Sequence, residues 1–167
     1  MKTLVTLVLA ATLAACGGSP TQSATPAAAT KARAPGSALK IGLTTVYVDD
    51  QAKALRFYTE VLGFSKKTDI TKGPFRWLTV IAPGDPEGTE LQLALNDNPA
   101  AKAYQDALFQ HSQPAVMFYT DDVKGAFDRI TRQGAAFTMP PTDVTGSTIA
   151  ILNDTCGNLV QLTQLTW

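Results

Sequence analysis

The residues of this sequence that could bind or transform a small molecule lie on strand-like segments, where they alternate with aliphatic residues. Leu91, Leu93 and Leu95, for example, alternate with Glu90 and Gln92. Such alternation places the two sets on opposite faces of a strand. One face then packs on helices, and the other carries hydrogen-bonding groups, rings and a thioether that suit a small organic ligand. The candidate ligand-binding set is Tyr47, Glu90, Gln92, Met117, Tyr119 and Gln161.

Within this set, Glu90 is the single carboxylate and the one candidate catalytic residue. As a buried group it could act as a general base with a raised pKa, or bind a polar part of a ligand. The other interpretation, an exposed residue at the start of a strand, is favoured because carboxylates are mostly exposed. The two glutamines either orient a ligand or hydrogen-bond to each other. The two tyrosines and the methionine either form a wall for a flat or apolar ligand or fill the core.

The other reactive residues fit structural roles. His111, the one histidine of the sequence, follows a helical segment, which predicts a surface position. Cys156 lies in a turn before the last strand and has no predicted base beside it, so we expect an inert thiol. Arg76 and Trp77 could close the mouth of a binding site through anion or cation–π contacts. Alternation places only one of these two on the ligand face.

The elements that position these residues occur twice, in residues 46–64 and 117–137. In each copy an apolar strand ends in an Asp pair, an amphipathic helix follows, and a glycine closes it. These residues are Asp49-Asp50 with Gly63, and Asp121-Asp122 with Gly134. The second Asp of each pair predicts a helix N-cap and each glycine a left-handed exit, so the Asp pairs are interpreted as caps and not as a catalytic dyad. A repeat this long indicates one supersecondary unit used twice.

Three strand-like runs follow each helix, so each unit reads β-α-β-β-β. The runs are 66–70, 76–81 and 90–95, then 136–139, 147–153 and 159–165, with Pro140-Pro141 as one of the separating turns. The modules cover about 40–96 and 114–165, and a helix over about 98–110, capped by Asn98 with Pro99 in its first turn, joins them. We expect an α+β fold in which the modules form a curved, cup-like mixed sheet with helices on the outer face.

The first residues predict export and lipid attachment. Residues 1–15 combine a Lys, a short apolar run and small residues, which is typical of a signal peptide. Leu13 to Cys16 resembles the bacterial lipobox, so Cys16 is expected to be acylated and to attach the chain to a membrane. Residues 16–38 are rich in Ala, Pro, Ser and Thr and predict a flexible tether, leaving 39–167 as the domain. In the enterobacterial lipoproteins that this segment resembles, an Asp directly after the acylated Cys retains the protein at the inner membrane. This sequence has Gly17 at that position. The resemblance therefore implies the outer membrane, facing the periplasm, if the host has one.

Composition narrows the range of partners. The 14 basic and 14 acidic residues give no net charge, and no Lys/Arg cluster indicates nucleic acid. Both modules lie in one chain, so a monomer could complete its own cup, and a homodimer is the alternative. The expected partners are a small-molecule ligand and the membrane.

The quoted elements resemble the vicinal oxygen chelate superfamily, which includes glyoxalase I, bleomycin-binding proteins, fosfomycin-modifying enzymes and extradiol dioxygenases. The resemblance rests on VYVDDQAKALRFYTEVLGF, TELQLAL, PAVMFYTDD and ILNDTCGNLVQL, which together span the domain. Superfamily enzymes usually hold a divalent metal with His, Gln or Glu from four strands. Carried over by position, these ligands fall at Leu43, Gln92, Ala115 and Gln161. Two of these side chains have no lone pair and two are neutral amides, so no metal cofactor is expected.

Three functions remain open. The first is a membrane-anchored protein that binds a small molecule in a cup lacking the usual metal ligands, in the style of the bleomycin-binding relatives. The second is a glyoxalase-type lyase, transferase or dioxygenase with an atypical metal site or with Glu90 as base. The third is a non-catalytic interaction protein of the cell envelope. The missing metal ligands favour binding over catalysis.

Overall fold

The structure is a computed structural model that describes residues 39–167, and these form one compact unit, Leu39–Trp167. The predicted signal peptide, the predicted acylation site at Cys16 and the predicted tether lie outside the described residues. Within residues 39–167, no helix is long and apolar enough to span a membrane.

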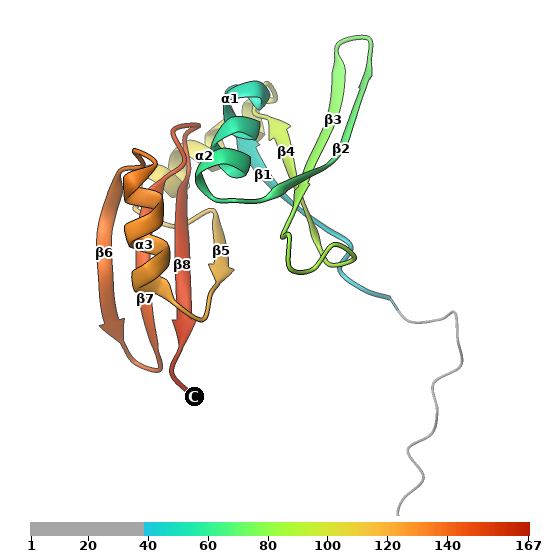
Figure 1. The fold of residues 1–167 in the computed structure, drawn as a ribbon. Helices are drawn as coiled ribbons and strands as arrows, with labels where there is room; N and C mark the ends of the chain where they lie inside the picture. The colour runs from blue at the N-terminus through green and yellow to red at the C-terminus, as the bar shows by residue number, and fades with distance from the viewer. Residues whose placement is uncertain (1–38) are drawn as a thin grey trace, which may run out of the picture. The chain divides into compact units, whose positions relative to one another are not determined.

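The first module is a β-α-β-β-β unit whose strands form one open sheet (Figure 1). Its elements are β1 (Leu43–Val48), α1 (Gln51–Arg56), η1 (Phe57–Val61), β2 (Ser65–Lys72), β3 (Phe75–Ile81) and β4 (Glu90–Leu95). The strand order is β1-β4-β3-β2, with β1 parallel to β4 and the other pairs antiparallel.

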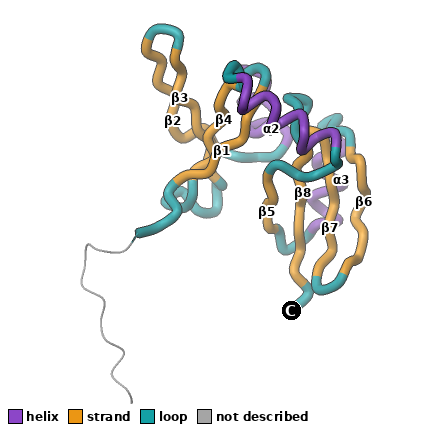
Figure 2. Tube along the Cα trace, turned by 180° about the vertical axis from the view of Figure 1, so that it is seen from behind, coloured by secondary structure: helices purple, strands orange, loops and turns teal. Residues whose placement is uncertain are grey.

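The second module repeats this topology after the joining helix α2 (Pro99–Gln110). Its elements are β5 (Val116–Tyr119), α3 (Val123–Arg132), β6 (Phe137–Val144), β7 (Ser147–Asn153) and β8 (Leu159–Leu165), in the sheet order β5-β8-β7-β6. The predicted α+β fold of two β-α-β-β-β modules is therefore confirmed. The described strands form two separate four-stranded sheets that stay open, where the sequence suggested one curved sheet. Viewed from behind, α2 runs from the first sheet to the second (Figure 2).

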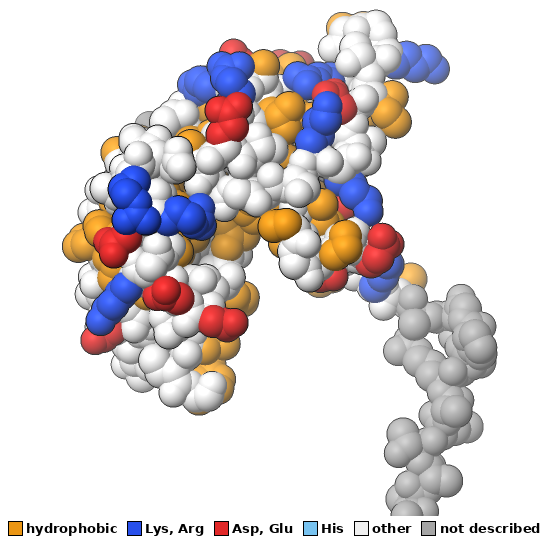
Figure 3. Space-filling model, in the orientation of Figure 1, with side chains coloured by type: hydrophobic (Ala, Val, Ile, Leu, Met, Phe, Trp, Pro, Cys, Tyr) orange, Lys and Arg blue, Asp and Glu red, His pale blue; other side chains and the backbone are white. Residues whose placement is uncertain are grey.

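The core lies between the sheets and the repeat helices, on the aliphatic face that alternation predicts. Each helix contributes the residues at its apolar spacing, and each sheet contributes every second residue of its strands. The fully buried members include Val46, Val48, Ala54, Tyr58, Leu78, Leu93, Val123, Leu152 and Val160. On the face shown in Figure 3, basic and acidic side chains are interspersed over the outside of this core.

Helix caps and closing glycines recur in both modules as predicted. The carboxylate of Asp50 accepts from the amides of Ala52 at 2.7 Å and Lys53 at 3.0 Å. The carboxylate of Asp122 accepts from the Gly125 amide at 2.8 Å. Gly63 and Gly134 both adopt a φ of 88°, in the left-handed region that favours glycine. The same local signals therefore begin and end the helix in each module.

The first repeat helix differs from the expected α-helix in its last turns. It is α-helical to Arg56 and continues as the π-helical segment η1, in which the Leu62 amide donates to the Phe57 carbonyl at 3.1 Å. Near this transition, the Thr59 hydroxyl donates to the Leu55 carbonyl at 2.7 Å. Such a side-chain bond competes with the regular backbone ladder and accompanies the widened turn.

The prediction that Pro140-Pro141 forms a turn between strands was wrong. Both prolines lie inside β6, and the turn falls after Val144. β6 is an edge strand, where a missing N–H costs no ladder bond on the open side, and its register with β7 shifts between Met139 and Thr142. Prolines are tolerated at edges and bulges of this kind.

Side chains and turns, not strand pairs, connect the two modules in the described chain. The Tyr58 hydroxyl donates to Asp154 at 3.3 Å. Gln105 of α2 donates to the carbonyls of Tyr47 at 2.7 Å and Cys156 at 2.9 Å, and Asn158 donates to Tyr47 at 2.8 Å. This buried polar network joins the first sheet, α2 and the β7–β8 turn.

Candidate ligand-binding site

Half of the predicted ligand-binding residues lie on the open face of the first sheet. Gln92 is opposite Thr45 and Ala94 is opposite Tyr47 in the β1–β4 pairing. The Thr45 hydroxyl donates to Gln92 Oε1 at 3.0 Å, and the buried Thr79 hydroxyl donates to Glu90 Oε2 at 2.6 Å. Glu90 is half-buried, whereas the sequence favoured an exposed position, and a hydrogen bond from Thr79 of its own sheet holds its carboxylate.

The other half lies on the open face of the second sheet. Met117 is opposite Gln161 in the β5–β8 pairing. The side chains of Met117 and Tyr119 are 48% and 68% exposed, so neither fills the core. Gln161 donates to Thr163 at 3.0 Å, whereas Gln92 accepts from Thr45, and no hydrogen bond between described residues joins the two glutamines.

The four positions at which the resemblance places metal ligands are spread over both sheets. Leu43 begins β1 and Ala115 immediately precedes β5, while Gln92 and Gln161 lie in β4 and β8. Residues 39–167 contain no group of three or more His, Cys, Asp or Glu side chains close enough to hold a metal ion. The donor set at these positions is two amides and two aliphatic side chains, which does not fit the metal that the superfamily enzymes hold.

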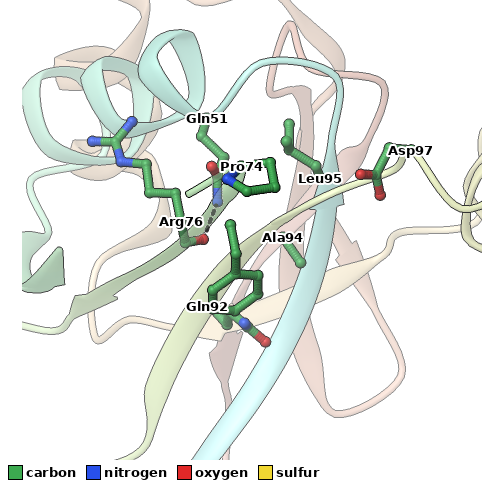
Figure 4. Close-up of a pocket in the computed structure, with 8 residues that line it drawn as sticks. Gln51, Pro74, Arg76, Gln92, Ala94, Leu95 and Asp97 are labelled. Carbon is green, nitrogen blue, oxygen red and sulfur yellow. Dashed lines mark hydrogen bonds between the residues drawn. The ribbon is translucent and has the colours of Figure 1, made fainter. Parts of the chain in front are cut away.

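A cleft opens in the first sheet where β3 leaves β4. These strands pair only at Thr79–Gln92 and Val80–Leu91, whereas β7 pairs with β8 at all seven positions of each strand. The gap in the first sheet is a cavity of about 130 Å³ (Figure 4). It is lined by Gln51, Pro74, Phe75, Arg76, Gln92, Ala94, Leu95 and Asp97.

Gln51, which follows the cap of α1, bridges the two strands at this cleft. Its amide nitrogen donates to the carbonyls of Arg76 at 3.0 Å and Leu93 at 2.7 Å, and its side chain is 7% exposed. Sequence reasoning missed this residue. The available signal was its spacing, because Gln51 lies three residues before Ala54 on the buried face of the helix, and Val123 takes its place after the second Asp pair.

The basic group near the cleft is paired with a carboxylate outside it, whereas an acidic group lines the cavity. The guanidinium of Arg76 forms two hydrogen bonds with Asp69, at 2.8 and 2.9 Å, and lowers the pKa of that carboxyl to about 2. In Figure 4 the Arg76 side chain points away from the cavity, while its backbone carbonyl accepts from Gln51. The carboxylate of Asp97 lines the cavity, and the Phe75 ring, 57% exposed, lies 6.4 Å from that of Trp77.

The reactive side chains outside the cleft have structural surroundings. Cys156 is fully buried, and burial raises the pKa of its thiol to about 12, in agreement with the inert thiol expected from sequence. Burial also raises the pKa of Asp154, whose carboxylate accepts from the amides of Cys156 and Asn158. His111 is exposed at the end of α2, as predicted.

The fold and the sequence together define the class of this protein. Residues 40–162 match the profile of the Glyoxalase/Bleomycin resistance protein/Dioxygenase superfamily. The chain therefore belongs to this superfamily.

The chain is similar in sequence to a protein of Bacillus subtilis and in fold to two solved structures. The chain is 48% identical to the uncharacterized protein YurT of Bacillus subtilis strain 168, over 75% of this chain and 99% of YurT. The crystal structure of UcmS2 is similar with a TM-score of 0.67 and 27% identity, over 75% of this chain and 98% of UcmS2. That of TnmS3, an antibiotic binding protein from Streptomyces sp. CB03234, is similar with a TM-score of 0.63 and 27% identity, over 78% and 99% of the two chains.

Proposed function

We propose that this chain is a membrane-anchored protein that binds a small molecule at the open face of its sheets, without a metal and without converting it. The observation that carries this proposal is the cleft between β3 and β4, where apolar walls surround a few convergent polar groups. Small-molecule sites have this composition. The similarity to TnmS3, which is an antibiotic binding protein, supports a binding role.

The residues at the family's metal positions support binding without a metal. Leu43 and Ala115 have no lone pair to donate, and the Gln92 oxygen already accepts from Thr45. A divalent cation is held far better by imidazole or carboxylate than by two neutral amides. Recognition would then depend on shape and hydrogen bonds.

The proposed anchor is the acylated Cys16, with the domain exported and facing the periplasm at an outer membrane. The family match begins at residue 40, which leaves the lipobox-like segment and the tether outside the domain. Growth with an alkyne-labelled fatty acid should label the full chain but not its Cys16→Ser variant. Equal labelling of both chains would refute lipid attachment at Cys16.

A ligand screen before and after chelation tests the binding proposal. The full-length chain, purified in detergent, is tested by thermal shift and calorimetry against a panel of antibiotics and small aromatic metabolites. We expect at least one compound to bind with a stoichiometry of one, to be recovered unchanged, and to keep its Kd within about 2-fold after EDTA treatment. A requirement for a tightly held metal, or conversion of the compound, would overturn the proposal.

The same screen distinguishes the enzymatic alternative. If Glu90 acted as a base, a compound would be converted and the Glu90→Gln variant would lose that conversion while keeping its fold. Under the proposed function, Glu90→Gln keeps a hydrogen-bond acceptor beside Thr79, so binding should change by less than about 3-fold.

A further inference from the structure

We infer that the β3–β4 cleft recognises a planar group that donates N–H hydrogen bonds, such as a carboxamide, a urea or an amino-substituted heteroaromatic ring. The side chains of Gln51, Gln92 and Asp97 would form hydrogen bonds with this group. The inference rests on the proposed function and assigns the ligand chemistry of its site.

The orientation of the Gln51 amide is fixed by its partners. Both partners, the backbone carbonyls of Arg76 and Leu93, can only accept hydrogen bonds, so the NH₂ group must face them. The carbonyl oxygen Oε1 is then directed elsewhere, and no described residue donates to it. It is not sealed inside the described protein, and Gln51 lines the cavity. This oxygen belongs to a side chain that is only 7% exposed and has no protein donor, so it is open to a donor from a ligand or from water.

The other polar groups of the cleft complement this acceptor. Gln92 Oε1 accepts from Thr45, which leaves the Gln92 NH₂ group to donate to a ligand carbonyl or ring nitrogen. Asp97 adds a carboxylate, whereas the nearby Arg76 guanidinium is bound to Asp69. The cleft therefore offers two acceptors and one donor, which suits an N–H-rich group and disfavours an anion.

The size and walls of the cleft indicate a single ring. Its volume is about 130 Å³, and a cavity of about 150 Å³ is known to hold benzene. Pro74, Phe75, Ala94 and Leu95 supply the apolar walls, and a ring could stack against Phe75. The second module has Val123 in place of Gln51 and a complete β7–β8 ladder, so the chain should hold one such ligand.

Matched probes test the ligand chemistry. Benzamide, benzoate and toluene share a ring but differ in donors and charge, and their binding to the full-length chain is measured by ligand-observed NMR titration. We expect benzamide to bind about 10-fold more tightly than either of the other two probes. Equal or tighter binding of benzoate or toluene would overturn the inference, as would the failure of all three to bind.

Two substitutions locate the effect. Gln51→Lys keeps N–H donors for the two strand carbonyls but replaces the acceptor by a cation, so benzamide should weaken and benzoate strengthen, each by about 5-fold. Asp97→Asn, at an exposed residue, should weaken benzamide by about 3-fold without affecting folding. Asp128→Asn, at an exposed residue of α3 in the second module, is the matched control and should leave benzamide binding unchanged.

The outcomes separate this inference from the proposed function. If compounds of the wider panel bind one to one but benzamide shows no preference, or if neither Gln51→Lys nor Asp97→Asn alters its binding, the inference fails and the binding function stands. If neither the panel nor the probes bind, both fail. Melting curves of each variant distinguish lost binding from lost folding, and Asp97→Asn keeps the test decisive if Gln51→Lys does not fold.

Discussion

The repeat helices of the two modules begin and end in the same way, but the modules differ in how their last two strands pair. Both begin their helix at an Asp cap and end it at a glycine with a φ of 88°. In the second module β7 and β8 pair along their whole length, whereas in the first β3 and β4 pair at two positions. The position that is Val123 in one helix is Gln51 in the other, and Gln51 bridges the strands where the ladder is missing. The candidate site thus appears where the repeat loses its symmetry.

A second difference lies in the turns that precede the last strand of each module. The β7–β8 turn carries Asp154, a buried carboxylate that accepts from Cys156, Asn158 and, in the other module, Tyr58. The β3–β4 loop begins with Ala82 and has no buried carboxylate. The second module therefore supplies the buried carboxylate of the polar junction, and the first module supplies the cleft.

The largest expected effect comes from removing this junction. Asp154→Ala should lower the free energy of unfolding by about 3 kcal/mol, because it leaves several buried donors without an acceptor. Urea denaturation measures the loss. The control Asp85→Ala, in the exposed β3–β4 loop, should stay within about 0.5 kcal/mol of the parent. Similar losses in both variants would contradict the assigned asymmetry.

Exchanging the residues at the equivalent helix positions, Gln51 and Val123, tests whether Gln51 holds β3 and β4 together at the cleft. Gln51→Val copies the second module and should cost about 2 kcal/mol, since two strand carbonyls lose their donor. Hydrogen exchange should show faster opening of residues 75–78. The reciprocal Val123→Gln buries an amide among apolar neighbours and should cost about as much. If Gln51→Val were neutral, Gln51 would not hold the strands together.

The glycines test where the modules are equivalent. Gly63→Ala and Gly134→Ala should each cost about 1 kcal/mol, because both backbones lie in the left-handed region and neither added Cβ meets an atom closer than 3.9 Å. Thermal unfolding of the two variants compares them directly. A loss of stability in only one of the two variants would show that the two helix ends are not energetically equivalent.

The smallest effect is the pH dependence of the Asp69–Arg76 pair in the first module. Arg76 lowers the folded-state pKa of Asp69 to about 2, below its usual 3.8, so the stabilisation is fully present above about pH 4 and is lost as pH falls through 2. The pair is partly exposed, so its contribution should stay below about 1 kcal/mol. Melting curves of the parent and Asp69→Asn between pH 2 and 5 should converge at the acid end. A constant difference would contradict the assignment.

Local signals in the sequence were sufficient for the order of helices and strands in each module. β4, β7 and β8 begin and end at the predicted residues, because turn residues and strict alternation mark both ends. Pro140-Pro141 misled the prediction because local sequence does not tell an edge strand from a central one. The π-helical end of the first helix also had no signal, since its apolar spacing is that of an α-helix.

The candidate site was less accessible from sequence. Alternation placed Glu90 and Gln92 on the open face, where the structure has them, but it could not foresee that Thr79 and Thr45 would bind them. Gln51 was missed because its role depends on two strands separating beside it, which is a tertiary event. Whether the sheets would merge into one was likewise beyond pattern reasoning, because alternation fixes the face of a residue and not the approach of two modules.

Every strand of the described chain finds its neighbours within its own module, the first strand beside the last. An insertion or a shift in one half therefore leaves the backbone ladder of the other intact. Exposed side chains on the strands of one module can therefore change without breaking a backbone hydrogen bond in the sheet of the other, and the buried contacts around Asp154 and Gln105 transmit a change between them.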